Sequence, residues 1–167
     1  INDCKEKYGD PMMIGYLPDT FGFNAQLPMI LKQVGIKDFI CWRGINFPKQ
    51  AGSVYFKWKG LGNCEVCVAS FPLGYYTGQI ALESKQNLQQ FVSERLDKGI
   101  DFESKHGDNS EVLVPSGIDQ MNIVRNLTET LEQINQLSKH EVVIGNYPHF
   151  MRSLANKNLN KYTGELR

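Results

Sequence analysis

Three things that this sequence lacks narrow the functions it can have. It has no excess of charge, because 18 lysines and arginines balance 18 aspartates and glutamates, so no net positive field attracts a nucleic-acid backbone or an anionic membrane surface. It has no apolar run near the roughly 20 residues of a membrane-spanning helix. Its first residues, INDCKEKYGD, lack the apolar core of a signal peptide. We therefore expect a soluble chain with neither nucleic acid nor membrane as a partner.

Cysteine is also scarce. The four cysteines, Cys4, Cys41, Cys64 and Cys67, are too few and too unevenly spaced for the disulfide framework of a small secreted domain. We therefore expect reduced thiols and a cytoplasmic location. Cys64 and Cys67 have the spacing of half a zinc knuckle, but no second pair of that kind follows, so a metal or redox role is disfavoured.

What the sequence does contain is typical of an α/β protein. Of its 167 residues, 41% are hydrophobic and 22% are charged, which is enough to build a compact domain with a sizeable core. Short apolar runs alternate with amphipathic patterns, as in folds with a parallel sheet. Strands are predicted at residues 12–16, 38–42, 54–58, 64–71, 112–114 and 142–144, with a hairpin turn at 60–63. Helices are predicted at 2–8, 27–34, 84–98 with Ser84 as N-cap and a stop before Gly99, 123–134 and 148–155, and a polar surface loop at 104–110.

Several predicted strands are followed by a polar or aromatic side chain. Asp19 follows the first strand, Arg43 the second, Tyr75 the second arm of the hairpin and Asp119 the strand at 112–114. Because the carboxyl ends of parallel strands meet at one rim, these side chains can converge. Two carboxylates on one rim suit glycoside hydrolysis, in which one is the nucleophile and the other the general acid. Taken singly, each aspartate is better explained as a turn former.

The residues around Asp19 are more specific than this pattern. Residues 15–31 read GYLPDTFGFNAQLPMIL, and this stretch closely resembles the nucleophile segment of glycoside hydrolase family 38, the α-mannosidases. Four further stretches resemble the same family in the same order: FICWRG at 39–44, FKWKG at 56–60, PLGY at 72–75 and LVPSGIDQM at 113–121. The resemblance covers nearly the whole chain and is closest to the bacterial members.

The resemblance implies a role for each residue on the rim. Asp19, in the PDTFG stretch, corresponds to the catalytic nucleophile and to one ligand of an active-site zinc ion. Phe21 corresponds to a residue that lines the sugar pocket, and Arg43 to the arginine beside the nucleophile. Asp119, in the GIDQM stretch, corresponds to the general acid and base. Tyr75 is assigned to substrate binding, with packing as the alternative.

The activity that the resemblance implies is a zinc-dependent, retaining hydrolysis of α-mannosidic bonds. Asp19 would attack the anomeric carbon to form a glycosyl-enzyme, and Asp119 would first donate and then recover a proton. The substrate would be a mannose-containing oligosaccharide or glycoside. One zinc ion is expected, but the family's other zinc ligands belong to a His-x-Asp segment upstream and a histidine far downstream, and the sequence has neither. Its three histidines are interpreted as structural or solvated: His106, His140 and His149.

The chain also reads as part of a longer polypeptide. The eight βα units of a closed barrel take about 250 residues, and residues 161–167 suggest no closing element. We therefore expect residues 1–167 to be a single-domain fragment from the middle of a family 38 catalytic domain. Its fold would be an incomplete parallel (β/α) barrel, part of a seven- or eight-stranded one. Its partner would be the remainder of the same polypeptide, and alone it is expected to bind zinc poorly and to be inactive.

Two other functions fit parts of the pattern. A metal-dependent polysaccharide deacetylase also uses an incomplete α/β barrel with an aspartate at its metal, but it needs clustered histidines near an Asp-Asp pair, which the sequence lacks. In a non-catalytic carbohydrate-binding or scaffold domain, the aspartates would only cap loops. Aromatic residues do not decide between these, because four that alternate along strands are predicted to be core: Trp42, Phe56, Trp58 and Phe71.

Overall fold

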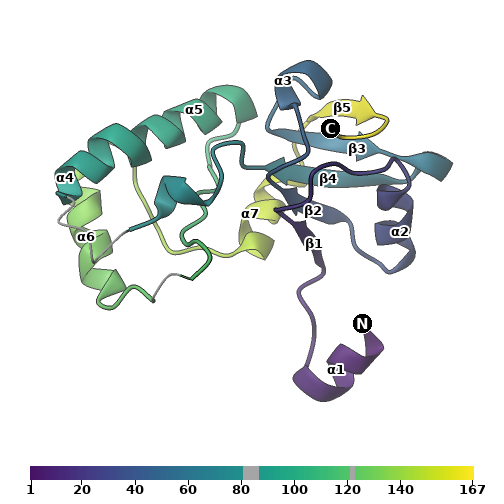
Figure 1. The fold of residues 1–167 in the computed structure, drawn as a ribbon, viewed down its shortest axis with the longest axis horizontal. Coiled ribbons are helices and arrows are strands. Elements are labelled where there is room, and N and C mark those ends of the chain that lie inside the picture. The colour runs from purple at the N-terminus through teal and green to yellow at the C-terminus, as the bar shows by residue number, and fades with distance from the viewer. Residues whose placement is uncertain (81–86, 121–122) are drawn as a thin grey trace. The chain divides into compact units, whose positions relative to one another are not determined.

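The computed structural model describes residues 1–80, 87–120 and 123–167. The chain forms two compact units (Figure 1). The first consists of Ile1–Pro72 and Asn146–Arg167, and the second of Leu73–Gly145. A sheet organises the first unit and helices organise the second, and each has its own cluster of buried side chains.

Five strands form the sheet of the first unit: β1 (Ile14–Leu17), β2 (Asp38–Cys41), β3 (Tyr55–Lys59), β4 (Glu65–Ser70) and β5 (Asn160–Thr163). Their order across the sheet is β1-β2-β4-β3-β5. The pairs β1/β2, β2/β4 and β3/β5 are parallel, and the hairpin β3/β4 is antiparallel. The mostly parallel α/β architecture and the hairpin are therefore as predicted. Residues 160–163, for which the sequence predicts no element, form β5 at the edge of the sheet. Its side chains are mostly exposed, so it lacks the apolar alternation that marks a strand in sequence.

Helices cover both faces of this sheet. On one face, α2 (Leu27–Gln33) buries Leu31 in the same cluster as Phe39 and Phe56. On the other face, α7 (Tyr147–Leu154) brings the Phe150 ring to 5.2 Å from the ring of Tyr55. Tyr55 and Phe56 are neighbours on β3, and successive residues of a strand point to opposite faces. A short helix, α3 (Phe47–Gln50), completes the loop between β2 and β3.

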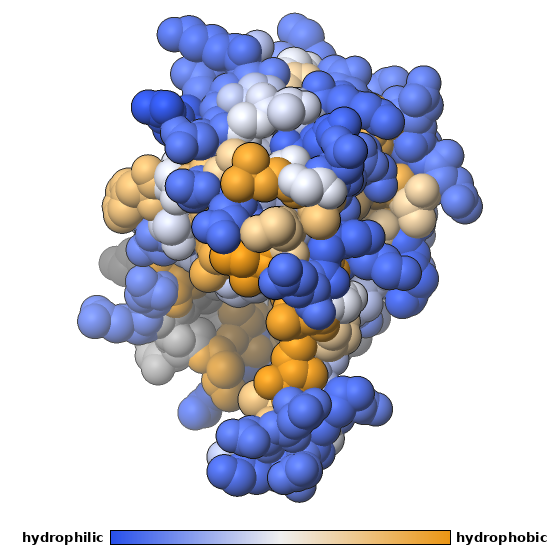
Figure 2. All heavy atoms as spheres, turned by 90° about the vertical axis from the view of Figure 1, so that its right-hand side faces the viewer, coloured by the Kyte–Doolittle hydropathy of each residue, from blue (hydrophilic) through white to orange (hydrophobic). Residues whose placement is uncertain are grey.

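The helix predicted at residues 2–8 is present as α1 (Asn2–Tyr8), which buries none of its side chains. It forms the hydrophilic lowest part of the view in Figure 2, with hydrophobic atoms directly above it. Met12 and Met13, in the segment between α1 and β1, are 47% and 37% exposed. Backbone hydrogen bonds, and not core packing, therefore hold α1.

A long helical stretch dominates the second unit. α4 (Leu88–Phe91), the π-helical η3 (Val92–Leu96) and α5 (Asp97–Gly107) follow one another directly. Asn87 caps this stretch, because its side chain accepts a hydrogen bond from the backbone N–H of Gln89 at 2.9 Å. The predicted cap, Ser84, lies outside the described residues.

The end of this stretch differs from the prediction. The sequence predicts a helix that stops before Gly99 and a loop at 104–110, but α5 continues to Gly107. Gly99 is a packing glycine, since a Cβ there would lie 2.4 Å from Cγ2 of Thr77. The helix ends where Asp108 adopts the left-handed conformation, with φ of 45°, and not at the first glycine.

The strands predicted at 112–114 and 142–144 are not present, because the structure describes both segments as irregular. Valines of both segments pack against the core of the second unit: Val112, Val114 and Val142. The backbone of Val142 pairs with the side chain of Asn135 on α6 (Leu127–Leu137), donating to Oδ1 at 2.7 Å and accepting from Nδ2 at 2.8 Å. These hydrogen bonds satisfy backbone groups that a neighbouring strand would otherwise pair. The apolar residues at 142–144 therefore indicate packing against the core and not membership of a sheet.

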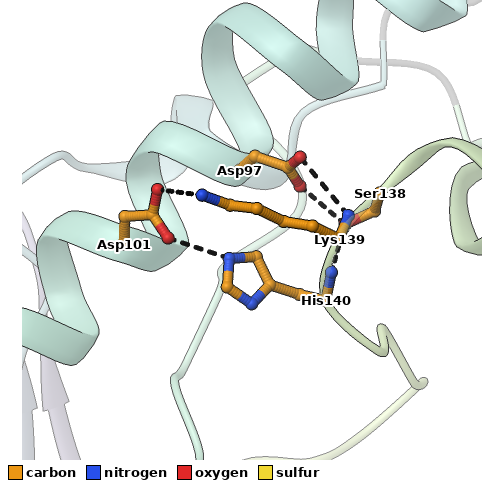
Figure 3. Close-up of polar contacts among 5 residues, drawn as sticks. All are labelled: Asp97, Asp101, Ser138, Lys139 and His140. Carbon is orange, nitrogen blue, oxygen red and sulfur yellow. Dashed lines mark hydrogen bonds and ion pairs between the residues drawn. The ribbon is translucent and has the colours of Figure 1, made fainter.

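A polar cluster ties α5 to the segment that follows α6 (Figure 3). Asp101 accepts a hydrogen bond from Nζ of Lys139 at 2.5 Å and contacts Nε2 of His140 at 3.0 Å. Asp97 accepts one from Oγ of Ser138 at 2.6 Å. The hydrogen bond from Lys139 holds the pKa of Asp101 below its ordinary value, and the same bond raises the pKa of Lys139. We call these five residues the α5 polar cluster, and through it His140 has a structural role.

Candidate active site

Asp19 and Arg43 lie in loops that follow two neighbouring parallel strands. The register pairs Leu17, the last residue of β1, with Cys41, the last residue of β2, so both loops leave the same end of the sheet. The backbone N–H of Arg43 donates to the C=O of Pro18 at 2.9 Å. Nε of Arg43 and Oδ1 of Asp19 form an ion pair. The fold therefore brings these two predicted site residues into contact.

Gly44 allows the two loops to approach so closely. A Cβ at this position would lie 2.1 Å from the backbone nitrogen of Gly22, far inside van der Waals contact. Its φ of 70° is also in the left-handed region that favours glycine. The glycine that ends the FICWRG stretch is thus needed for the contact between the loops of Asp19 and Arg43.

Aromatic rings hold the guanidinium of Arg43 in place. Its Cζ lies 4.1 Å from the ring centroid of Trp42 and 5.4 Å from that of Phe21, within cation–π range. Trp42 stacks in turn on Phe71, with 6.4 Å between centroids. Nε of Arg43 is buried and has no hydrogen-bond partner among the described residues. Its interaction with Asp19 is therefore an ionic contact and not an aligned hydrogen bond.

The support that Trp42 gives to Arg43 is a functional feature that the sequence prediction missed. The sequence predicts a core role for Trp42, whereas its side chain is only half-buried and lies under the arginine. The signal that could have identified it is its place directly before Arg43, at the end of a strand.

The outer side of this group faces solvent. The side chains of Asp19 and Arg43 are 59% and 40% exposed, and Phe21 is 79% exposed. A carboxylate accepts hydrogen bonds from hydroxyl groups, and a ring presents an apolar face beside it. The arrangement can therefore receive a polyhydroxylated ligand such as a sugar.

Phe23 anchors the loop that carries Asp19 and Phe21. Its backbone exchanges two hydrogen bonds with Leu166, at 2.8 and 3.0 Å. Its ring is buried, with centroids 5.1 Å from that of Phe39 and 6.2 Å from that of Trp58. The loop is thus fixed at one end by β1 and at the other by the core.

The second unit carries Tyr75 and Asp119. Tyr75 begins the short helix η2 (Tyr75–Gly78) and is half-buried. Asp119 is exposed and lies in a turn with Gln120, whose φ is 61°. The backbone N–H of Gly78 donates to the C=O of Pro115 at 3.1 Å, which joins η2 to the segment leading to Asp119. Of the five predicted residues, three therefore meet in the first unit, and the other two belong to the second.

The chain matches the model of a known protein family. The family model described as "Glycosyl hydrolases family 38 N-terminal domain" matches residues 4–165. The chain belongs to this family. The suspected resemblance to family 38 is therefore confirmed, over nearly the whole chain.

Relatives of this family 38 chain include two α-mannosidases. Alpha-mannosidase G of Dictyostelium discoideum is 32% identical over 80 residues, which are 45% of this chain and 7% of that protein. Alpha-mannosidase 2C1 of Mus musculus is 35% identical over 99 residues, which are 56% of this chain and 9% of that protein. The matches thus span less than a tenth of either relative.

A solved structure has the same fold. The crystal structure of an alpha-mannosidase from Enterococcus faecalis V583 superposes with a TM-score of 0.83 at 21% identity, covering 97% of this chain and 19% of that one. At this identity the likeness establishes the fold alone. It supports the mostly parallel α/β architecture of this family 38 chain.

The described residues of this family 38 chain do not form a complete metal site. Within residues 1–80, 87–120 and 123–167, no three His, Cys, Asp or Glu side chains are grouped so that they could hold a metal ion. The ion-pair partner of Asp19 is Arg43, a cation. Zinc sites use three or four protein ligands, and the described residues place no ligand set of that size around Asp19.

Proposed function

We propose that this chain is part of the catalytic domain of an α-mannosidase that hydrolyses α-mannosidic bonds with retention of configuration. The observation that carries the proposal is the Asp19–Arg43 ion pair beside the exposed ring of Phe21, at the carboxyl ends of parallel strands. Membership of family 38 and the two α-mannosidase relatives support it. The complete enzyme requires parts of the polypeptide beyond this chain.

In the proposed reaction, one carboxyl group is the nucleophile and the other is the general acid and base. A carboxylate oxygen of Asp19 forms a bond to the anomeric carbon while the glycosidic C–O bond breaks, and Asp119 gives its proton to the leaving oxygen. Asp119 then takes a proton from water, the water oxygen attacks the anomeric carbon, and the bond to Asp19 breaks. Arg43 orients the Asp19 carboxylate, and Phe21 contacts the sugar. Tyr75 is assigned to substrate binding.

We further propose that Asp19 is one ligand of a zinc ion whose other ligands come from outside this chain. A bound zinc would supply a Lewis acid and a template for the sugar hydroxyls. Because one carboxylate is not a zinc site, the isolated chain would bind zinc poorly and be inactive.

The proposed substrate is a mannose-containing oligosaccharide or glycoside, and the proposed location is the cytoplasm. The four cysteines are free thiols, which is usual in a reducing compartment. No helix in the described part of the chain is long and apolar enough to cross a membrane.

The test is to vary Asp119 in the complete polypeptide and to change the leaving group. We expect Asp119→Ala to slow the cleavage of a mannoside with a poor leaving group about 10²–10⁴-fold, and that of an activated aryl mannoside much less, because the latter needs no proton. Asp19→Ala should slow both. Asp10→Asn, at an exposed carboxylate that pairs with Lys5, is the control. If binding of mannosides persists while no variant changes hydrolysis, the non-catalytic carbohydrate-binding alternative is correct.

A further inference from the structure

A second hollow lies at the other end of the strands from Asp19 and Arg43. It measures about 500 Å³, and all the residues that line it belong to the first unit. Asp38, the first residue of β2, lies in its lining, whereas Arg43 follows the last residue of the same strand. The hollow is therefore separate from the candidate active site.

A row of side chains across three strands runs along this hollow. The register places Asp38 of β2 beside Cys67 of β4, and Cys67 beside Lys57 of β3. These residues share one face of the sheet, since their strand neighbours, such as Phe56, belong to the core on the opposite face. Lys57 and Cys67 both line the hollow, and burial raises the pKa of the Cys67 thiol although the nearby charge of Lys57 acts in the opposite direction.

Positive charge gathers around this row. The lining contains four cations and two carboxylates, a surplus of two positive charges, although the whole chain has none. The further cations are Lys32, Lys37 and Arg152. One of the carboxylates, Glu65, already has Lys161 at 3.8 Å as an ion-pair partner.

The remaining carboxylate, Asp38, forms no direct ion pair with these cations. Among the described residues, no ion pair within 4 Å joins Asp38 to a lysine or arginine. Burial raises the pKa of Asp38, although the charges of Lys57 and Lys37 act in the opposite direction. The cations of the hollow thus retain capacity for an external anion.

We propose that this hollow binds a phosphate-type dianion, either inorganic phosphate or the phosphoryl group of a small phosphomonoester. A dianion matches the surplus of two charges, and ammonium and guanidinium groups are the usual donors to phosphate oxygens. The volume suits a small molecule. An extended polyanion such as nucleic acid fits less well, because the chain as a whole carries no net positive charge.

The test is calorimetric titration of the chain with inorganic phosphate and with a hexose 6-phosphate, each at constant ionic strength in chloride. We expect saturable binding that Lys57→Met weakens about tenfold or more. Arg152→Gln, at an exposed position on α7, should also weaken it. Tighter binding of the hexose phosphate would identify a phosphomonoester as the ligand, and equal binding would identify free phosphate.

Two further variants separate a site from a general charge effect. Asp38→Asn removes a negative charge from the lining and should tighten binding, a gain that loss of folding cannot imitate. Lys49→Met removes an exposed lysine of α3 outside the lining and should leave the affinity unchanged. Absence of saturable binding, or equal weakening by Lys49→Met and Lys57→Met, would overturn the proposal. The readout is independent of the proposed glycosidase activity.

Discussion

Two features of Gly44 disfavour any other residue at this position. Its backbone is in the left-handed conformation, and an added Cβ would lie only 2.1 Å from the backbone nitrogen of Gly22. We expect Gly44→Ala to lower the free energy of unfolding by about 2–4 kcal/mol. The left-handed conformation costs an L-residue about 1–2 kcal/mol, and the loops must also move apart. Urea unfolding followed by tryptophan fluorescence measures this loss.

Gly35→Ala is the matched control for this prediction. Gly35 has φ of 84°, but the nearest atom to an added Cβ is Cε of Met13 at 3.6 Å, an ordinary contact. This variant should lose only the conformational cost of about 1–2 kcal/mol. Equal losses in the two variants would mean that the close approach of the two loops contributes nothing.

At the scale of residues, a site residue could be predicted from the sequence when the pattern that marks it lies close to it along the chain. Asp19 and Arg43 could be found because each follows an apolar strand and lies in a specific motif. The support of Arg43 by Trp42 was harder to find, since only its place beside Arg43 indicates it in sequence, and the packing of Trp42 against Phe71 joins residues almost thirty positions apart. Short-range patterns identify a reactive side chain more readily than the side chains that position it.

At the scale of elements, the α5 polar cluster makes one contact in the second unit dependent on pH. The pKa of Asp101 is lowered, chiefly by the hydrogen bond from Lys139. The stabilisation is therefore present above the ordinary carboxyl value of 3.8 and is lost as the pH falls through the lower folded-state value. We expect Asp101→Asn to lower the urea midpoint at neutral pH, and the difference from the parent chain to shrink as the pH falls below 3.8.

The opposite sign applies to Lys139. Its pKa is raised, so its share of the stabilisation is present below the ordinary value of 10.5 and is lost as the pH rises through the higher folded-state value.

Asp10→Asn is the control for the Asp101→Asn prediction, because Asp10 is an 89% exposed surface carboxylate in the first unit. A difference between Asp101→Asn and the parent chain that stays constant into acid would contradict the assignment.

Strands were predictable from the sequence where the apolar runs belong to the sheet. β1, β2 and the β3/β4 hairpin lie where the alternation predicts them. The run at 142–144 misleads because Asn135 satisfies the backbone of Val142. Gly99 misleads because a packing glycine and a terminating glycine look the same in sequence.

At the scale of the whole molecule, the incomplete ligand set leads to a prediction about metal removal. A chelator should leave the thermal unfolding midpoint of the isolated chain unchanged, because no three ligating side chains gather within its described ranges. The complete polypeptide should lose hydrolysis on chelation and regain it with zinc. A stoichiometric end point in a zinc titration of the isolated chain would contradict this prediction.

The division into two units could not be predicted from the sequence. Composition indicates only that a core can form, and no linker-like stretch marks Pro72 or Asn146, where the units meet in sequence. The return of the last residues to the first unit depends on a pairing between segments a hundred residues apart. Local patterns carry no information about such a pairing.

That pairing has a consequence for how the chain emerges during synthesis. β3 is complete at Lys59, but its parallel partner β5 begins only at Asn160. At a translation rate of 5–20 residues per second, the β3 edge waits roughly 5–20 s for its partner. An open strand edge is a template for pairing with other chains. Through that interval the nascent chain depends on dilution, or on a chaperone, to avoid intermolecular pairing.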